Sequence, residues 1–182
     1  CSNNALNTNQ KIFLVINLVL GTLVILSYII GLRAGKSADV LWGGVPENTR
    51  GIYTVSMIIS AISFFLFSIY IFLLMKNTEI ILPFSLNPSI FNILYSILLI
   101  FSATWIPLVN VMVNNPSDVV WFGIRLGLAL VGLSTLAILI IILKISPKET
   151  STLFYLSVVG LSWFFIHTGI LDAIIWPYLW ER

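Results

Sequence analysis

The chain has 182 residues, of which 59% are hydrophobic and only 9% are charged, and its formal net charge is +2. A soluble domain carries about 25% charged residues, so this composition excludes an ordinary soluble enzyme. The apolar content also excludes a disordered chain, and the nine scattered basic residues form no tract that would bind nucleic acid. What remains is an integral membrane protein with little mass outside the lipid bilayer.

Five apolar stretches are long enough to cross a membrane, because about 20 helical residues span a hydrocarbon core of ~30 Å. They lie at about 12–32, 51–75, 89–113, 119–143 and 153–176. Open strands are excluded, because lipid would leave their backbone N–H and C=O groups unpaired. The sequence therefore predicts an all-α fold, a multi-pass five-helix bundle forming one transmembrane domain over 1–182. Lys and Arg divide equally between the two sides, so the orientation and the particular membrane stay open.

The longest connection is residues 34–50, an irregular loop whose Trp42 is expected to rest on the membrane surface. An odd number of spans places the termini on opposite sides of the membrane. This loop lies on the side opposite the N-terminus, here called side B. The chain has a single cysteine, Cys1, which excludes an internal disulfide. Two interpretations of Cys1 stay open: a processed end that carries a lipid, or the continuation of an earlier segment.

Ionisable residues inside a span are costly and usually mark a functional site or a helix contact. Three stand out, Arg125 in the fourth span and His167 and Asp172 in the fifth. Chain direction places them, with several polar and aromatic residues, in the half of the bundle toward side B. This asymmetry predicts a ligand pocket between the helices, beneath the loop 34–50. The candidate ligand-binding residues are Trp42, Arg50, Trp105, Asn110, Arg125, Trp163, His167, Asp172 and Trp176.

The pairing of these charges follows from helix geometry. An α-helix turns about 100° per residue, so His167 and Asp172 are separated by about 140° and are not expected to share a face. Asp172 is instead expected to meet Arg125 or Arg50 from another helix. The alternatives are structural: an interhelical ion pair that only positions two spans, and a His167 that is a hydrogen-bonded packing residue.

The chain resembles the translocator protein, or tryptophan-rich sensory protein (TspO), family. The likeness is carried by a Trp/Pro motif at 103–107, by Ser146–Pro147 before the fifth span, and by Trp163, Asp172 and Trp176 within it. Asp172 stands where that family often has Asn, and the second proline of its third-helix motif is absent. The resemblance implies a hydrophobic pocket for porphyrin- or sterol-like molecules, formed by Trp105, Asp172 and Trp176, with the first loop as its lid.

Three functions are compatible with this pattern. The first is the binding or carriage of a hydrophobic or amphipathic ligand. The second is an accessory structural subunit of a larger membrane complex, or a homodimer. The third is a proton-coupled transporter or membrane enzyme acting through His167, Asp172 and Arg125. An enzyme usually needs more converging acid–base groups, so a non-enzymatic role is favoured. The sequence requires no cofactor or metal, and a porphyrin-like ligand is implied only by the family resemblance.

Overall fold

The computed structural model describes residues 5–34, 38–77, 79–147 and 150–180. Five membrane-spanning segments are present, in agreement with the predicted all-α class. The first four are α1 (Thr8–Ala34), α2 (Glu47–Leu74), α3 (Ser89–Asn114) and α4 (Asp118–Leu143). The fifth span is continuous but changes its helix type. It begins as α5 (Thr152–Phe165), continues as the π-helix η3 (Ile166–Ile175) and ends as α6 (Trp176–Leu179).

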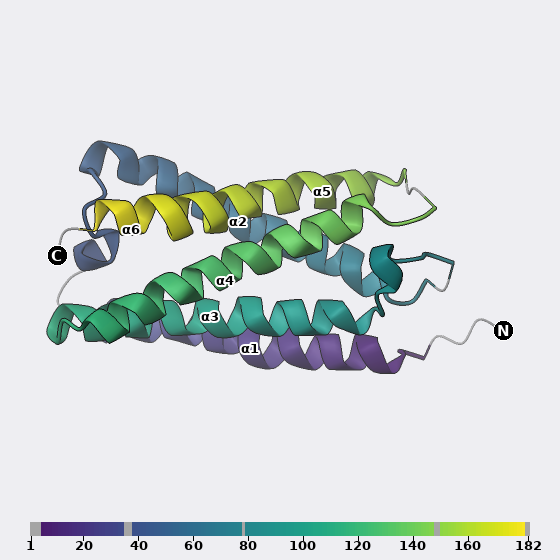
Figure 1. The fold of residues 1–182 in the computed structure, drawn as a ribbon, viewed down its shortest axis with the longest axis horizontal. Coiled ribbons are helices and arrows are strands. Elements are labelled where there is room, and N and C mark those ends of the chain that lie inside the picture. The colour runs from purple at the N-terminus through teal and green to yellow at the C-terminus, as the bar shows by residue number, and fades with distance from the viewer. Residues whose placement is uncertain (1–4, 35–37, 78, 148–149, 181–182) are drawn as a thin grey trace.

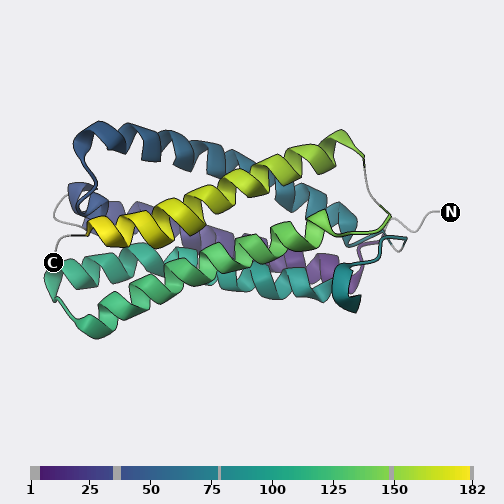
Figure 2. The same cartoon turned by 45° about the horizontal axis from the view of Figure 1, so that its top comes forward.

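The helices form an open arc rather than a closed ring. α1 packs on α3, α3 on α4, α4 on α5 and η3, and α5 on α2. α4 runs diagonally between the α1–α3 pair and the α2–α5 pair (Figures 1 and 2). α1 and α2 are therefore the two ends of the arc, and within the described residues they do not pack on each other to a comparable extent. This arrangement leaves α1 and α2 apart, so that the space between them opens sideways, toward the lipid.

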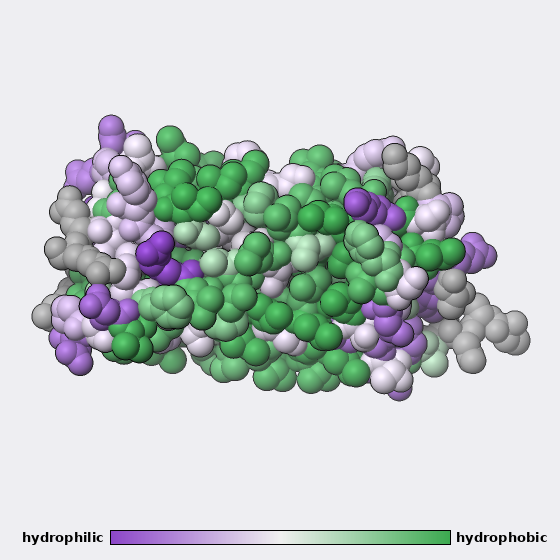
Figure 3. Space-filling view, in the orientation of Figure 1, coloured by the Kyte–Doolittle hydropathy of each residue, from purple (hydrophilic) through white to green (hydrophobic). Residues whose placement is uncertain are grey.

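The outer surface matches a bilayer environment. An apolar belt covers the middle of the molecule, and hydrophilic residues gather at its two ends (Figure 3). α1 contributes strongly to this belt, because Val15, Val19 and Ile30 are each about 54–60% exposed. Such side chains are stable only against lipid or another apolar surface. The structure therefore supports an integral membrane protein by the length and composition of its helices.

Two apolar cores hold the bundle together. The first is aromatic and includes Phe67 and Tyr95, which are fully buried with ring centroids 6.2 Å apart. The second lies toward side B and includes Trp121 and Trp176. Between α4 and η3 the backbones themselves approach. A Cβ atom added at Gly132 would lie 2.7 Å from the Cα atom of Gly169. Small residues permit this close packing, as is common between helices in lipid.

The short helix η1 (Ala38–Trp42) covers part of side B. The indole Nε1 of Trp176 donates a hydrogen bond to the backbone oxygen of Leu41 at 3.0 Å. The Trp42 ring meets the Tyr53 ring edge-on, with centroids 6.3 Å apart. Cys1 lies outside the described residues, so both interpretations of that residue stay open.

Candidate functional site

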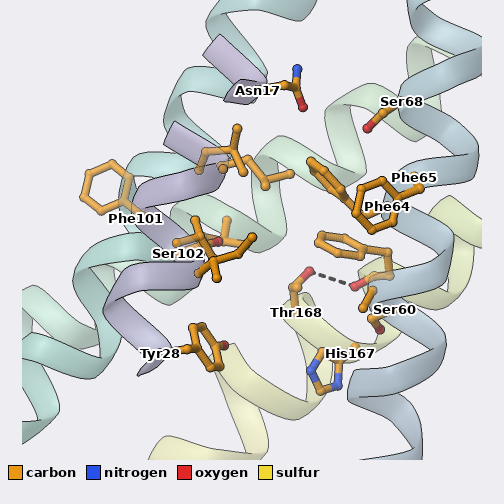
Figure 4. A pocket seen from close by; sticks show the side chains of 18 of the residues that line it. Asn17, Tyr28, Ser60, Phe64, Phe65, Ser68, Phe101, Ser102, His167 and Thr168 are labelled. Atoms are coloured by element: carbon orange, nitrogen blue, oxygen red, sulfur yellow. Dashed lines mark hydrogen bonds between the residues drawn. The ribbon is translucent and has the colours of Figure 1, made fainter. Parts of the chain in front are cut away.

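A cavity of about 820 Å³ lies inside the membrane-spanning region, between α1 and α2. Its walls come from all five spans, with α1 and α2 on two facing sides and α3, α4, α5 and η3 behind them (Figure 4). Apolar side chains make up most of the lining. Representative members are Leu18, Ile25, Phe64, Phe65, Leu128 and Phe164. The cavity therefore occupies the gap left by the open arc of helices.

The cavity extends along much of the length of α1. Phe13 and Tyr28 both line it, and the rise of an α-helix puts them roughly 22 Å apart along the helix axis. Figure 4 shows Asn17 and Ser68 toward one end and Tyr28 and His167 toward the other. Asn17 is satisfied locally, because its Nδ2 donates to the Phe13 oxygen at 2.8 Å. The unsatisfied polar groups are therefore concentrated at the Tyr28–His167 end, which we call the polar end.

His167 and Asp172 lie together at the polar end, which corrects the sequence prediction. His167 Nε2 is 3.5 Å from Asp172 Oδ2, although an α-helix would separate the two side chains by about 140°. The physical reason is the π-helix η3, in which hydrogen bonds run from i to i+5. Residues five apart in a π-helix lie one turn apart on the same face. Both side chains line the cavity.

Several polar atoms near this end have no hydrogen-bond partner among the described residues. They are Nδ1 of His167, Nε1 of Trp105 and Oγ of Ser60, and all three are buried. Buried polar groups in proteins are nearly always paired, because losing water without a replacement costs free energy. The polar end therefore has hydrogen-bonding capacity that the described chain does not use.

The two arginines are placed away from Asp172, so the predicted Arg–Asp pair is wrong for both. Arg50 Nη1 donates to Oδ1 of Asp39 at 2.9 Å, and its guanidinium carbon lies 5.7 Å from the centre of the Trp42 ring. Arg125 is exposed on the outer side of α4. The face of α4 that turns inward carries Ile124 and Leu128, and Arg125 lies about 100° away from Ile124.

The remaining candidates divide into cavity-lining residues and residues that lie elsewhere. Trp105 lines the cavity and contacts the Trp176 ring, with centroids 5.7 Å apart. Trp176 does not line the cavity but lies in a tryptophan cluster toward side B. Asn110 joins α3 to α1, because its Nδ2 donates to the Gly31 oxygen at 3.2 Å. Trp163 is 37% exposed and does not line the cavity.

The tryptophan cluster consists of Trp105, Trp121, Trp176 and Trp180. The ring centroids of Trp176 lie 5.7, 6.1 and 4.8 Å from those of Trp105, Trp121 and Trp180. Trp176 is 3% exposed and also holds η1 through its bond to Leu41. The cluster and η1 therefore cover the cavity toward side B.

We expect Trp176→Phe to loosen η1 without unfolding the bundle. A smaller phenyl ring replaces the indole, and the N–H donor to the Leu41 oxygen is lost; the lost hydrogen bond alone should cost about 1 kcal/mol. Limited proteolysis should then cut the loop 34–50 faster than in the wild type. Trp163→Phe is the matched control, because Trp163 is on the outer surface, and it should leave the cutting rate unchanged. Equal cutting rates in both variants would contradict the role of this hydrogen bond.

Sequence reasoning missed the walls contributed by α1 and α2. Gly21, Tyr28, Ser60 and Phe64 all line the cavity, but none is charged and none was a candidate. One signal was available. Ser56, Ser60 and Ser63 recur at spacings of four and three in α2, and all are buried. A stripe of small hydroxyl residues at helical spacing indicates the inward face of a membrane helix.

The fold and this cavity define a class: an all-α, multi-pass membrane protein with an internal, mostly apolar cavity. Neither a protein-family model nor a curated protein nor a solved structure matches the chain. The function is therefore inferred from the geometry of the chain's own residues.

Proposed function

We propose that this protein binds or carries a hydrophobic or amphipathic ligand within the membrane, in the cavity between α1 and α2. The observation that carries this proposal is the cavity itself, of about 820 Å³ with an apolar lining and one polar end. Small-molecule sites commonly measure about 300–1,000 Å³ and combine apolar walls with a few polar groups. The proposed role needs no chemical reaction and no cofactor.

The route of entry follows from the same geometry. Side B is covered by η1 and the tryptophan cluster, whereas α1 and α2 leave a gap that faces the bilayer. A ligand dissolved in lipid would enter sideways between these two helices. A TspO-type relationship also remains a proposal, which rests on the sequence motifs at 103–107 and 163–176.

Saturable photolabelling tests this function. A photoactivatable hydrocarbon probe should label cavity residues such as Tyr28 and Phe64, and an excess of unlabelled hydrocarbon should suppress that labelling. Labelling at outward residues such as Phe122 and Ile174, which are 66% and 63% exposed, should not saturate because bulk lipid reaches them. If peptide mapping found only non-saturable labelling at outward residues, the cavity would not be a binding site.

A second candidate function is an accessory subunit of a membrane complex. The observation that favours it is the surface of α1, because only 6% of an 18-residue apolar stretch of this helix is buried. A helix of a partner, or of a second copy, would cover this surface in the same gap between α1 and α2. Purification in mild detergent with cross-linking at Leu18 tests it. A cross-linked partner or dimer would support this function, and an uncross-linked monomer would contradict it.

A further inference from the structure

Asp172 lacks a permanently charged partner. Its side chain is 28% exposed and it lines the cavity. Among the described residues, the nearest basic group is the His167 imidazole at 3.5 Å, whereas Arg50 binds Asp39 and Arg125 faces outward. A carboxylate inside a membrane is costly unless a cation or hydrogen-bond donor compensates it. A ligand with such a donor would therefore gain a strong contact here.

Two aromatic residues line the same cavity as this carboxylate. The rings of Tyr28 and Trp105 lie 6.3 Å apart, and both line the cavity. Tyr28 comes from α1 and Trp105 from α3, so two helices other than η3 contribute these rings to the cavity lining. The face of an aromatic ring is electronegative and attracts ammonium groups, most strongly where water is excluded. A carboxylate beside aromatic rings favours a cationic head over a neutral or anionic one.

The rest of the cavity is apolar and long enough for an extended hydrocarbon chain. It extends roughly 22 Å along α1, which exceeds the thickness of one leaflet of hydrocarbon, about 15 Å. Away from the polar end, the polar side chains Asn17, Thr22 and Ser68 line the cavity and already have partners within the chain, which are Phe13, Leu18 and Tyr95. The gap between α1 and α2 lets such a chain pass from the bilayer without crossing η1.

We propose that the ligand is a lipophilic amine with a single long apolar chain. Its ammonium group lies at Asp172 near the rings of Tyr28 and Trp105. Its chain lies in the cavity between α1 and α2 and extends toward Phe13. This inference rests on the proposed function and specifies the class of ligand. It involves binding only, with no bond made or broken.

A series of probes with the same 16-carbon chain tests it. Hexadecylamine, hexadecanol, palmitate and hexadecane are titrated against the purified protein in nanodiscs of a neutral lipid. The amine should bind at least tenfold more tightly than the alcohol or the alkane, because only the amine brings a charged donor to Asp172. Palmitate should bind most weakly of the four, because its carboxylate would face that of Asp172.

Two variants test whether the preference for the amine comes from Asp172 or from the overall charge of the protein. Asp172→Asn keeps the size of the side chain but removes its charge, and should reduce the preference for amine over alcohol to threefold or less. Asp118→Asn, at the start of α4 and outside the cavity, should keep the wild-type preference. If the four probes bind the wild type equally, or if Asp172→Asn keeps the preference, the amine inference is wrong and the proposed function stands. If none of the four binds saturably, the proposed function and this inference both fail.

Discussion

Phe67→Ala is expected to lower the free energy of unfolding by about 3–5 kcal/mol, the usual cost of truncating a buried Phe. Phe67 is completely buried, and its ring contacts those of Phe64 and Phe164 with centroids 5.5 and 5.4 Å away. In lipid this cost comes from lost dispersion contacts rather than from water, because lipid tails are as apolar as the core. Unfolding followed by titration with a denaturing detergent measures the change.

Phe122→Ala is the matched control for this substitution. Phe122 has the same side chain but is 66% exposed on α4, so its removal leaves no internal void. We expect a change within about 0.5 kcal/mol, as for other surface substitutions. If both variants lost the same stability, Phe67 would not lie in a packed core, and the described arrangement of α2, α3 and α5 would be wrong.

Gly21→Leu is expected to reduce ligand affinity at least tenfold, because it fills the slot between α1 and α2. Gly21 lines the cavity, and a Cβ atom at this position meets no atom within 4 Å. The leucine side chain therefore enters open space without straining the fold. It should even stabilise α1, because Leu has a higher helix propensity than Gly by roughly 0.5–1 kcal/mol. Titration with the tightest-binding probe measures the loss.

Gly123→Leu is the control that separates filling of the cavity from the gain in helix propensity. Gly123 lies in α4, does not line the cavity, and also has no atom within 4 Å of an added Cβ. This variant should gain the same helix propensity and keep the wild-type affinity. Equal affinities in both variants and in the wild type would show that the ligand does not pass through or occupy the slot beside Gly21.

The spans were predictable because hydropathy alone identifies stretches long enough to cross a bilayer. The ends of the helices were harder to predict than the spans themselves. α2 begins at Glu47 rather than near 51, and α1 at Thr8 rather than near 12, because polar residues extend the helices beyond the hydrocarbon core. Chain direction predicts Trp105, His167 and Asp172 in the same half of the bundle, and all three line the cavity.

The pairing of His167 with Asp172 could not be predicted, because it depends on the π-helix η3. A wheel of 100° per residue describes an α-helix, and the segment 166–175 carries no sequence pattern that specifies i to i+5 bonding. Gly169 lies in η3 against Gly132 of α4, where the two backbones approach closely. Gly132 and Gly169 are far apart in the sequence, so this contact between them cannot be predicted from the sequence alone.

The prediction that Arg125 and Trp163 point into the pocket is wrong for a different reason. Membrane helices are apolar on every side, so their hydropathy alone does not separate the face that meets lipid from the face that meets protein. A charged residue was therefore assigned inward by default, although Arg125 is exposed on α4. The apolar walls of the cavity, such as Gly21 and Phe64, were missed for the same reason.

Native mass spectrometry of the protein released from its own membrane tests the central claim most directly. The claim is that the cavity between α1 and α2 holds an apolar or amphipathic molecule. The account predicts a bound molecule that survives release from the wild type and from Gly123→Leu but is lost from Gly21→Leu. Equal retention of the same molecule by Gly21→Leu, or a wild type without any bound molecule, would contradict it.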